Sequence, residues 1–361
     1  MNSATNTRGH RTTTALLATL ASVICAVVLA ACARKSAAWF TNYDDALNAA
    51  QHANKRIILF LSADEQPTSV ALKTLFTSQA FIDTFGKDFV LVNLDFSKSR
   101  FDAARNIRTD STDDDIQAAL DAQDALMRDV KLSMYIGARQ NPALYLLTKD
   151  GYPITQLVME DALSSVDEFT AVLDAQTQTA ADYEELIAQV AATADLDRAR
   201  AIDAVYDATP TQSRYMVLPL CRQVPTLDPA NKTGIVGKHI LAIANGLASD
   251  AFLSQDVELA AAEFERAAEN PLLNTDERQE AYYTAAYLLA QGMSTDYDEM
   301  LRLAQLSYDA APESDYAERI MEFIGKITQQ IAMVQQMQED VKIVTDNGAH
   351  DDFNEPLVSA E

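Results

Sequence analysis

Consecutive apolar residues mark the first half of the chain. Runs of β-branched and aliphatic residues occupy positions 56–61, 89–95 and 143–147, and segments with apolar residues three and four positions apart separate them. Such runs are typical of strands that are buried on both faces. Strand, helix and strand in succession predict a parallel strand pair in an α/β domain over residues 37–175. A further run at 153–158 follows a short polar turn and predicts a hairpin.

The second half of the chain repeats apolar residues at helical spacing. Residues 176–345 therefore predict an all-helical domain, and a polar tail follows at 346–361. Breaks are expected at Asn270-Pro271, Gly292 and Pro312. The clearest apolar faces are Val257, Ala260, Ala261, Phe264, Ala267 and Ala268 on one helix, Tyr283, Ala286, Tyr287 and Ala290 on another, and Tyr316, Ile320, Phe323, Ile327, Ile331 and Val334 on a third.

A weak internal repeat runs through these helices. Alanines recur at an offset of 43 residues, as in Ala261 and Ala304 or Ala268 and Ala311. Helix pairs with small residues at their crossings resemble tetratricopeptide-type repeats. This resemblance implies a helical-repeat array with a concave surface that binds proteins or peptides. An irregular helical bundle is the alternative.

The amino terminus has the pattern of a secretory signal peptide. Residues 1–31 contain two arginines and no acidic residue, and an apolar run ends in Leu29-Ala30-Ala31-Cys32. This ending resembles the lipobox of bacterial lipoproteins, which implies that the leader is removed and that the Cys32 thiol carries a lipid such as palmitate. Residues 32–36 are then a lipidated tether to a membrane of the bacterial envelope. The alternative is a transmembrane anchor. The apolar run from Ala15 to Ala31 has about the shortest length, roughly 17 residues, that can span a membrane.

The charge of the chain is strongly acidic and unevenly distributed. The net charge is -25 and the sequence pI is about 4.4. Nucleic-acid binding and polybasic lipid binding both need clustered lysine and arginine, so the composition argues against both. Residues 32–160 carry 14 basic and 17 acidic side chains, whereas residues 161–361 carry 12 and 36. The helical half therefore favours a basic protein or peptide partner. The alternative is that its acidic surface only maintains solubility.

Cysteine and histidine are too few and too scattered for a metal site. The chain has three cysteines and four histidines, without the spacing of metal ligands, and we expect neither a metal nor a cofactor. Removal of Cys25 with the leader and lipidation of Cys32 leave Cys221 as the one free thiol, which excludes an intramolecular disulfide. The apolar neighbours of Cys221 predict a buried, unreactive thiol.

Several motifs in residues 37–175 occur in a familiar order. They are the aromatic Trp39, the stretch Lys55–Ser69 that ends in Gln66-Pro67-Thr68-Ser69, the strand Phe89–Asp95 and the pair Asn141-Pro142. Together they resemble the secreted branch of the thioredoxin-like superfamily. Gln66 and Ser69 stand at the positions of the two redox cysteines, and Pro142 stands at the position of the cis-proline.

The resemblance implies a peptide-binding groove without redox chemistry. Thiol–disulfide exchange needs a thiolate and a second thiol, and neither Gln66 nor Ser69 supplies one. In the family, the loop before the cis-proline presents backbone groups to an extended peptide, so Asn141 and Pro142 are expected to face Gln66 and Ser69. The alternative is that Pro142 only shapes a turn and Ser69 only caps or packs a helix.

These features predict a lipid-anchored, non-enzymatic scaffold or adaptor that binds a protein or peptide in the bacterial envelope. A thiol oxidoreductase that uses Cys221, or a hydrolase, is one alternative, and a purely structural envelope protein is another. The sequence leaves the oligomeric state open, because the long terminal helix is suited both to packing within its own chain and to pairing with a second copy.

Overall fold

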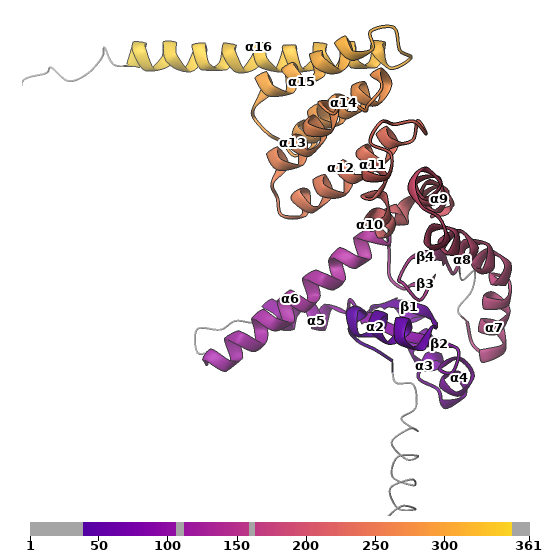
Figure 1. Cartoon of the computed structure of the whole chain (residues 1–361). Helices are drawn as coiled ribbons and strands as arrows, with labels where there is room; N and C mark the ends of the chain where they lie inside the picture. The colour runs from indigo at the N-terminus through magenta and orange to yellow at the C-terminus, as the bar shows by residue number, and fades with distance from the viewer. Residues whose placement is uncertain (1–38, 106–111, 159–162, 349–361) are drawn as a thin grey trace, which may run out of the picture. The chain divides into compact units, whose positions relative to one another are not determined.

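The computed structural model describes residues 39–105, 112–158 and 163–348 (Figure 1). The predicted leader, Cys32 and the tether 32–36 lie outside the described residues. Within these ranges no helix is both long and apolar enough to cross a membrane.

The chain divides into two compact units. The first runs to Glu184 and also includes residues 209–216, and the second comprises residues 185–208 and the chain from Val217 onward. Arg56 donates two hydrogen bonds of 2.8 and 2.7 Å to the Glu184 carboxylate, which attaches this helical segment to the sheet. The first unit is therefore longer than the predicted domain, which ended at residue 175.

A four-stranded sheet forms the centre of the first unit, with the strand order β2-β1-β3-β4. Its strands are β1 Arg56–Ser62, β2 Phe89–Asp95, β3 Ala143–Leu147 and β4 Pro153–Gln156. β1 and β2 are parallel with Arg56 opposite Phe89, whereas β3 is antiparallel to both β1 and β4. The predicted parallel pair and the predicted hairpin are both confirmed.

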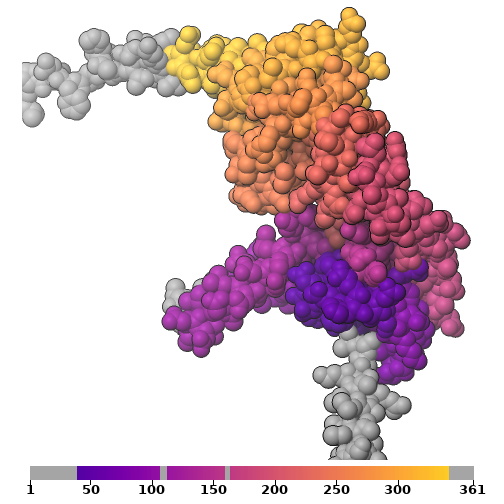
Figure 2. Space-filling model, in the orientation of Figure 1, coloured from indigo at the N-terminus to yellow at the C-terminus, as the bar shows by residue number. Residues whose placement is uncertain are grey.

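Helices precede, connect and follow the strands of this unit. They are α2 Tyr43–Ala53, α3 Pro67–Phe76, α4 Gln79–Phe85, α5 Lys98–Arg105, α6 Asp113–Tyr135, α7 Val166–Asp174 and α8 Thr177–Ala192, and a 3-10 helix spans Thr211–Val217. Side chains fix their starts: Asn42 accepts hydrogen bonds at the start of α2, and Thr112 forms a capping box with Asp115 at the start of α6. The amino-terminal half of α6 extends away from the sheet (Figures 1 and 2).

Alternating residues of β1 contribute to two different cores. Ile57, Leu59 and Leu61 pack in an aliphatic cluster with α2, β2 and β3. Phe60 points to the opposite face, as the two-residue period of a strand requires. There it meets an aromatic cluster of Trp39, Phe76, Phe81, Phe85 and Phe169, in which Trp39 lies 5.5 Å from Phe76 between ring centroids. Both faces of the sheet are thus covered.

The second unit consists of helices. They are α9 Asp195–Ala208, α10 Leu218–Cys221, α11 Val224–Leu227, α12 Val236–Leu253, α13 Val257–Ala268, α14 Thr275–Gln291, α15 Tyr297–Ala310 and α16 Ala317–Gly348. The predicted breaks at Asn270-Pro271, Gly292 and Pro312 are confirmed, and Asn274 and Asp296 cap α14 and α15. Cys221 is fully buried on α10. α16 continues to Gly348, so it includes residues 346–348 of the predicted tail, whose remaining residues lie outside the described part.

The predicted apolar faces agree with the structure on α13 and in part on the other two helices. Ala260, Ala261 and Phe264 are buried on α13. Ile320 and Ile327 are buried on α16, whereas Tyr316 precedes that helix and is exposed. On α14 only Ala286 of the predicted face is buried, and Tyr287 is exposed. The buried residues of α14 are Gln279, Ala281, Ala285, Ala286 and Leu289. Alanine permits the close approach of α13 and α15 on either side of α14, and the bulky tyrosines lie outside these contacts.

Candidate functional site

Gln66 and Ser69, the residues predicted to stand at the two cysteine positions, have opposite environments. Gln66 is exposed and directly precedes α3, which begins at Pro67, and its side chain makes no capping hydrogen bond. Ser69 lies in the first turn of α3 and is fully buried. Its Oγ accepts a hydrogen bond of 2.8 Å from the backbone N–H of Ala63. Ser69 therefore holds the loop between β1 and α3.

A groove of about 540 Å³ lies beside Gln66 at the carboxyl ends of β1 and β2. Asn141 also lines this groove, and the Asn141–Pro142 peptide bond is cis. The structure thus brings Gln66 and Asn141 together, and Ser69 is not among the lining residues. The other residues that line the groove are Ala63, Glu65, Phe96, Lys98, Phe101, Asp102 and Arg105.

Two carboxylates fix the segment between β2 and α5, which forms one side of the groove. Asp95 accepts hydrogen bonds from the Ser97 backbone N–H at 3.1 Å and from the Ser97 hydroxyl at 2.8 Å. Glu65 accepts a hydrogen bond of 2.6 Å from the backbone N–H of Lys98, which ties the β1–α3 loop to the first residue of α5. Because these bonds satisfy backbone donors in loops, they hold the groove in one shape.

An ion pair attaches α5, which follows this segment, to α6. Arg100 donates to the backbone oxygen of Asp95 at 2.7 Å, and its guanidinium lies 2.7 Å from the Asp129 carboxylate. Burial raises the pKa of Asp129 above its ordinary value, and the hydrogen bond and charge of Arg100 offset part of that rise. Arg100 therefore links the end of β2 to α6, the helix that leads toward Asn141.

The two amide side chains of the groove have unused hydrogen-bonding capacity. Neither the Gln66 nor the Asn141 side chain has a hydrogen-bond partner among the residues that the structure describes. Each carboxamide has two N–H donors and one carbonyl acceptor. Phe96 and Phe101 are half-buried and supply apolar surface in the same groove. This combination suits an extended peptide, which offers both backbone polar groups and apolar side chains.

The described residues that line the groove supply amide, carboxylate, cationic and apolar side chains. Among the described residues that line it, none carries a thiol or an imidazole. In the described ranges, no group of three or more histidine, cysteine, aspartate or glutamate side chains could hold a metal ion. The groove is thus equipped for binding by hydrogen bonds, apolar contact and charge.

Several groove residues were not predicted from the sequence. Glu65, Phe96, Lys98, Phe101 and Arg105 follow the ends of β1 and β2, and ligands of α/β sheets commonly bind at the carboxyl ends of parallel strands. Applied to the predicted strands at 56–61 and 89–95, this rule would have directed attention to residues 63–66 and 96–105.

Family comparisons agree with the division into two kinds of structure. Residues 38–153 match a family model described as thioredoxin-like. Residues 235–333 match a family model described as an uncharacterised protein C-terminal domain. No curated protein gives a significant match to the chain. The chain therefore contains a thioredoxin-like domain with a small mixed α/β sheet, and an all-helical region follows it.

Proposed function

We propose that this protein is a lipid-anchored scaffold or adaptor of the bacterial envelope, and that its thioredoxin-like domain binds an extended segment of a partner protein without redox chemistry. The single observation that carries this proposal is the pair of amides, Gln66 and Asn141, which have no hydrogen-bond partner among the described residues and lie in one groove beside the cis Asn141–Pro142 bond. A half-buried amide such as that of Asn141 is usually satisfied within the protein, whereas both of these amides have donors and acceptors available to a ligand.

The partner segment binds along the groove through its backbone and apolar side chains. The amides of Gln66 and Asn141 pair with the backbone N–H and C=O groups of the segment. Phe96 and Phe101 contact apolar side chains of the segment. Specificity then comes from the four charged residues on the edges of the groove, Glu65, Lys98, Asp102 and Arg105.

The surroundings of Ser69 and Cys221 support a function without redox chemistry. The Ser69 hydroxyl is buried and already accepts the Ala63 N–H, and no cysteine stands at position 66. Cys221 is also fully buried, and a buried thiol in apolar surroundings is a poor nucleophile. In the part of the chain that the structure describes, a disulfide substrate would therefore find no accessible thiolate.

The pattern Leu29-Ala30-Ala31-Cys32 supports attachment of the protein to a membrane through lipid on Cys32. Six residues separate Cys32 from Trp39, the first described residue. At roughly 3.5 Å per residue, this tether spans at most about 25 Å. The groove then works close to the membrane surface, and its partner is a protein that is exposed there.

Capture of the partner from cells tests the proposal. Cells that produce the full chain with a carboxy-terminal tag are treated with formaldehyde, and captured proteins are quantified by mass spectrometry. We expect a defined partner whose recovery falls at least about tenfold in the Gln66→Ala, Asn141→Ala double variant, because each lost hydrogen bond to a ligand costs about 0.5–1.5 kcal/mol and leaves a ligand group unpaired.

The matched control is the double variant Asn48→Ala, Gln51→Ala, which removes two exposed amides from α2. Recovery of the partner with this control should equal that with the natural sequence. Equal recovery with the groove variant and the control would contradict the groove as the binding site.

A further inference from the structure

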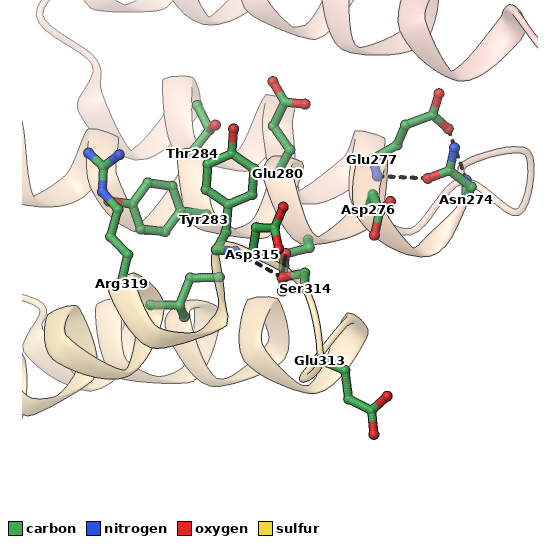
Figure 3. A pocket seen from close by; sticks show the side chains of 13 residues that line it. Asn274, Asp276, Glu277, Glu280, Tyr283, Thr284, Glu313, Ser314, Asp315 and Arg319 are labelled. Atoms are coloured by element: carbon green, nitrogen blue, oxygen red, sulfur yellow. Dashed lines mark hydrogen bonds between the residues drawn. The ribbon is translucent and has the colours of Figure 1, made fainter.

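The second unit contains a cavity of about 670 Å³ (Figure 3). Residues of α14, of the connection between α15 and α16, and of the first turn of α16 line it. This volume lies within the range of about 300–1,000 Å³ that is usual for ligand-binding pockets. The site lies in the region that follows the thioredoxin-like domain, so it is distinct from the groove at Gln66.

A buried glutamine holds the elements around this cavity together. The Gln279 side chain on α14 donates to the backbone oxygens of Ala311 at 2.8 Å and Ser307 at 3.2 Å. The Ser307 hydroxyl donates in return to the backbone oxygen of Gln279 at 2.8 Å, and the Ser314 hydroxyl donates to the Gln279 side-chain oxygen at 2.5 Å. The cavity is therefore preformed, because these bonds fix the end of α15 and the following connection against α14.

The cavity is lined by an excess of negative charge. Five carboxylates line it, those of Asp276, Glu277, Glu280, Glu313 and Asp315, against one guanidinium, that of Arg319. None of the five carboxylates forms an ion pair with another described residue. The Tyr283 ring lies on the side of Arg319, and Glu313 points away from the other labelled carboxylates (Figure 3). A cation that enters the cavity thus meets an excess of carboxylates that have no ion-pair partner among the described residues, although Glu277 also accepts the Asn274 backbone N–H.

The pKa of Glu280 is raised above its ordinary value, chiefly by reduced contact of the carboxyl with water and secondly by the charge of Glu277, although the side chain as a whole is exposed. A positive charge in the cavity would offset this rise, because it would stabilise the ionised carboxylate.

An aromatic residue of the cavity already contacts a cation. The Arg319 guanidinium carbon lies 5.8 Å from the centre of the Tyr283 ring, within the range of a cation–π contact. Tyr283 is held in place by Phe323, at 5.7 Å between ring centroids, and by Tyr287, at 6.1 Å. Tyr316 also lines the cavity, and 65% of its surface is exposed, so a second aromatic face is open to a ligand.

We propose that this cavity binds a lysine or arginine side chain of a basic segment of a partner protein. The excess of carboxylates together with the exposed ring of Tyr316 fits an ammonium or guanidinium group on an aliphatic stem. A metal ion fits less well, because the carboxylates that line the cavity do not form a group that could hold one. Asp276, Asp315 and Tyr316 are exposed at its rim, which suits a polypeptide that passes across the opening.

Fluorescence anisotropy with the full chain tests this site. The probe is a fluorescein-labelled ten-residue peptide of alternating lysine and serine, and the comparison peptide alternates glutamate and serine. We expect the lysine peptide to bind and the glutamate peptide not to bind. The double variant Glu280→Gln, Asp315→Asn should weaken binding of the lysine peptide at least about tenfold, because two charges that contact the ligand are removed.

The matched control removes two exposed acidic charges from α16 outside the cavity, as Glu339→Gln, Asp340→Asn. This control should change the affinity less than about twofold. Equal weakening by both double variants would overturn the proposal, because binding would then reflect only the overall acidity of the chain. The exposed Tyr316 gives an independent test, because Tyr316→Ala should weaken binding about threefold through the lost aromatic contact.

Two further measurements distinguish peptide binding in this cavity from binding of small cations and from binding in the groove. Free spermidine should compete with the lysine peptide only weakly; competition at equal affinity would assign the cavity to small cations and overturn the proposal. The Gln66→Ala, Asn141→Ala variant should bind the lysine peptide as the natural sequence does. A loss of binding in that variant would place the peptide in the groove and contradict the cavity as its site.

Discussion

The Oγ of Ser69 accepts a hydrogen bond of 2.8 Å from the backbone N–H of Ala63. This contact uses the Ser69 hydroxyl to fix the loop that leads into α3. Ser69 therefore has a structural role, whereas Gln66, three residues earlier, is exposed at the groove.

Ser69→Ala should lower the free energy of unfolding of the first unit by about 1–3 kcal/mol, because it leaves the buried N–H of Ala63 without a partner. Urea denaturation followed by tryptophan fluorescence measures this change. Trp39 is the only tryptophan, and it packs on Phe76 and Phe81 in the first unit, so its fluorescence reports that unit. Thr68→Ala, an exposed change in the same turn, should have an effect within about 0.5 kcal/mol. An unchanged midpoint for Ser69→Ala would show that the hydrogen bond is not needed.

Tyr145→Phe should leave the stability unchanged or raise it by up to about 1 kcal/mol at neutral pH, because the buried Tyr145 hydroxyl has no hydrogen-bond partner in the described structure. The variant should also differ at high pH. Burial raises the pKa of Tyr145 from 10.0 to about 12.

The phenol of Tyr145 therefore ionises in the unfolded chain before it ionises in the folded one. Its contribution to folding stability is fully present below pH 10 and is lost as the pH rises through about 12. Urea denaturation between pH 8 and 11 should show a steeper loss of stability for the natural sequence than for Tyr145→Phe. Parallel pH profiles would contradict the burial of this hydroxyl.

Cys221 should react with a thiol reagent only when the second unit unfolds, because its side chain is fully buried. A soluble chain that begins at residue 33 contains Cys221 as its one cysteine, so the reagent reports a single site. We expect slow labelling in buffer, rapid labelling in urea and no reduction of insulin by this chain. Insulin reduction that disappears in the Cys221→Ser variant would instead support an oxidoreductase.

Gln279→Leu should lower the free energy of unfolding of the second unit by about 1–3 kcal/mol, because the backbone oxygens of Ser307 and Ala311 lose their side-chain donor. Thermal denaturation followed by circular dichroism at 222 nm measures the loss. Gln305→Leu on the exposed surface of α15 is the control and should change stability by less than about 0.5 kcal/mol. Equal effects of the two variants would show that the buried hydrogen bonds of Gln279 contribute no more to stability than an exposed one.

Much of the first unit could be predicted because its signals are local. The runs at 56–61 and 89–95 determine two buried strands. The Asn141-Pro142 pair precedes the strand predicted at 143–147. The order of these motifs therefore predicted that Gln66 and Asn141 lie close together. The direction of the Ser69 hydroxyl did not follow. It depends on the path of the loop at Ala63, which only the folded structure determines.

Boundaries and helix faces were harder to predict because tertiary contacts decide them. Residues 176–184 have ordinary helical spacing, and it is the pairing of Arg56 with Glu184 that joins them to the sheet. On α14, helical spacing alone could not distinguish the face of Tyr283 and Tyr287 from the face of Ala281 and Ala285. The latter is buried because small residues allow neighbouring helices to approach. The cavity beside Tyr283 could not be predicted either, because it depends on how α14 packs against the start of α16.

Site-specific photocrosslinking shows directly whether a partner protein binds in the groove at Gln66 and Asn141. A photoreactive benzoylphenylalanine is placed at position 66 or 141 of the full chain in cells, with position 87 on the exposed surface of the same unit as the control. We expect one partner protein in the same adduct from positions 66 and 141, and none from position 87. Absence of adducts at both groove positions, or the same adducts at all three positions, would contradict a protein-binding groove at Gln66 and Asn141.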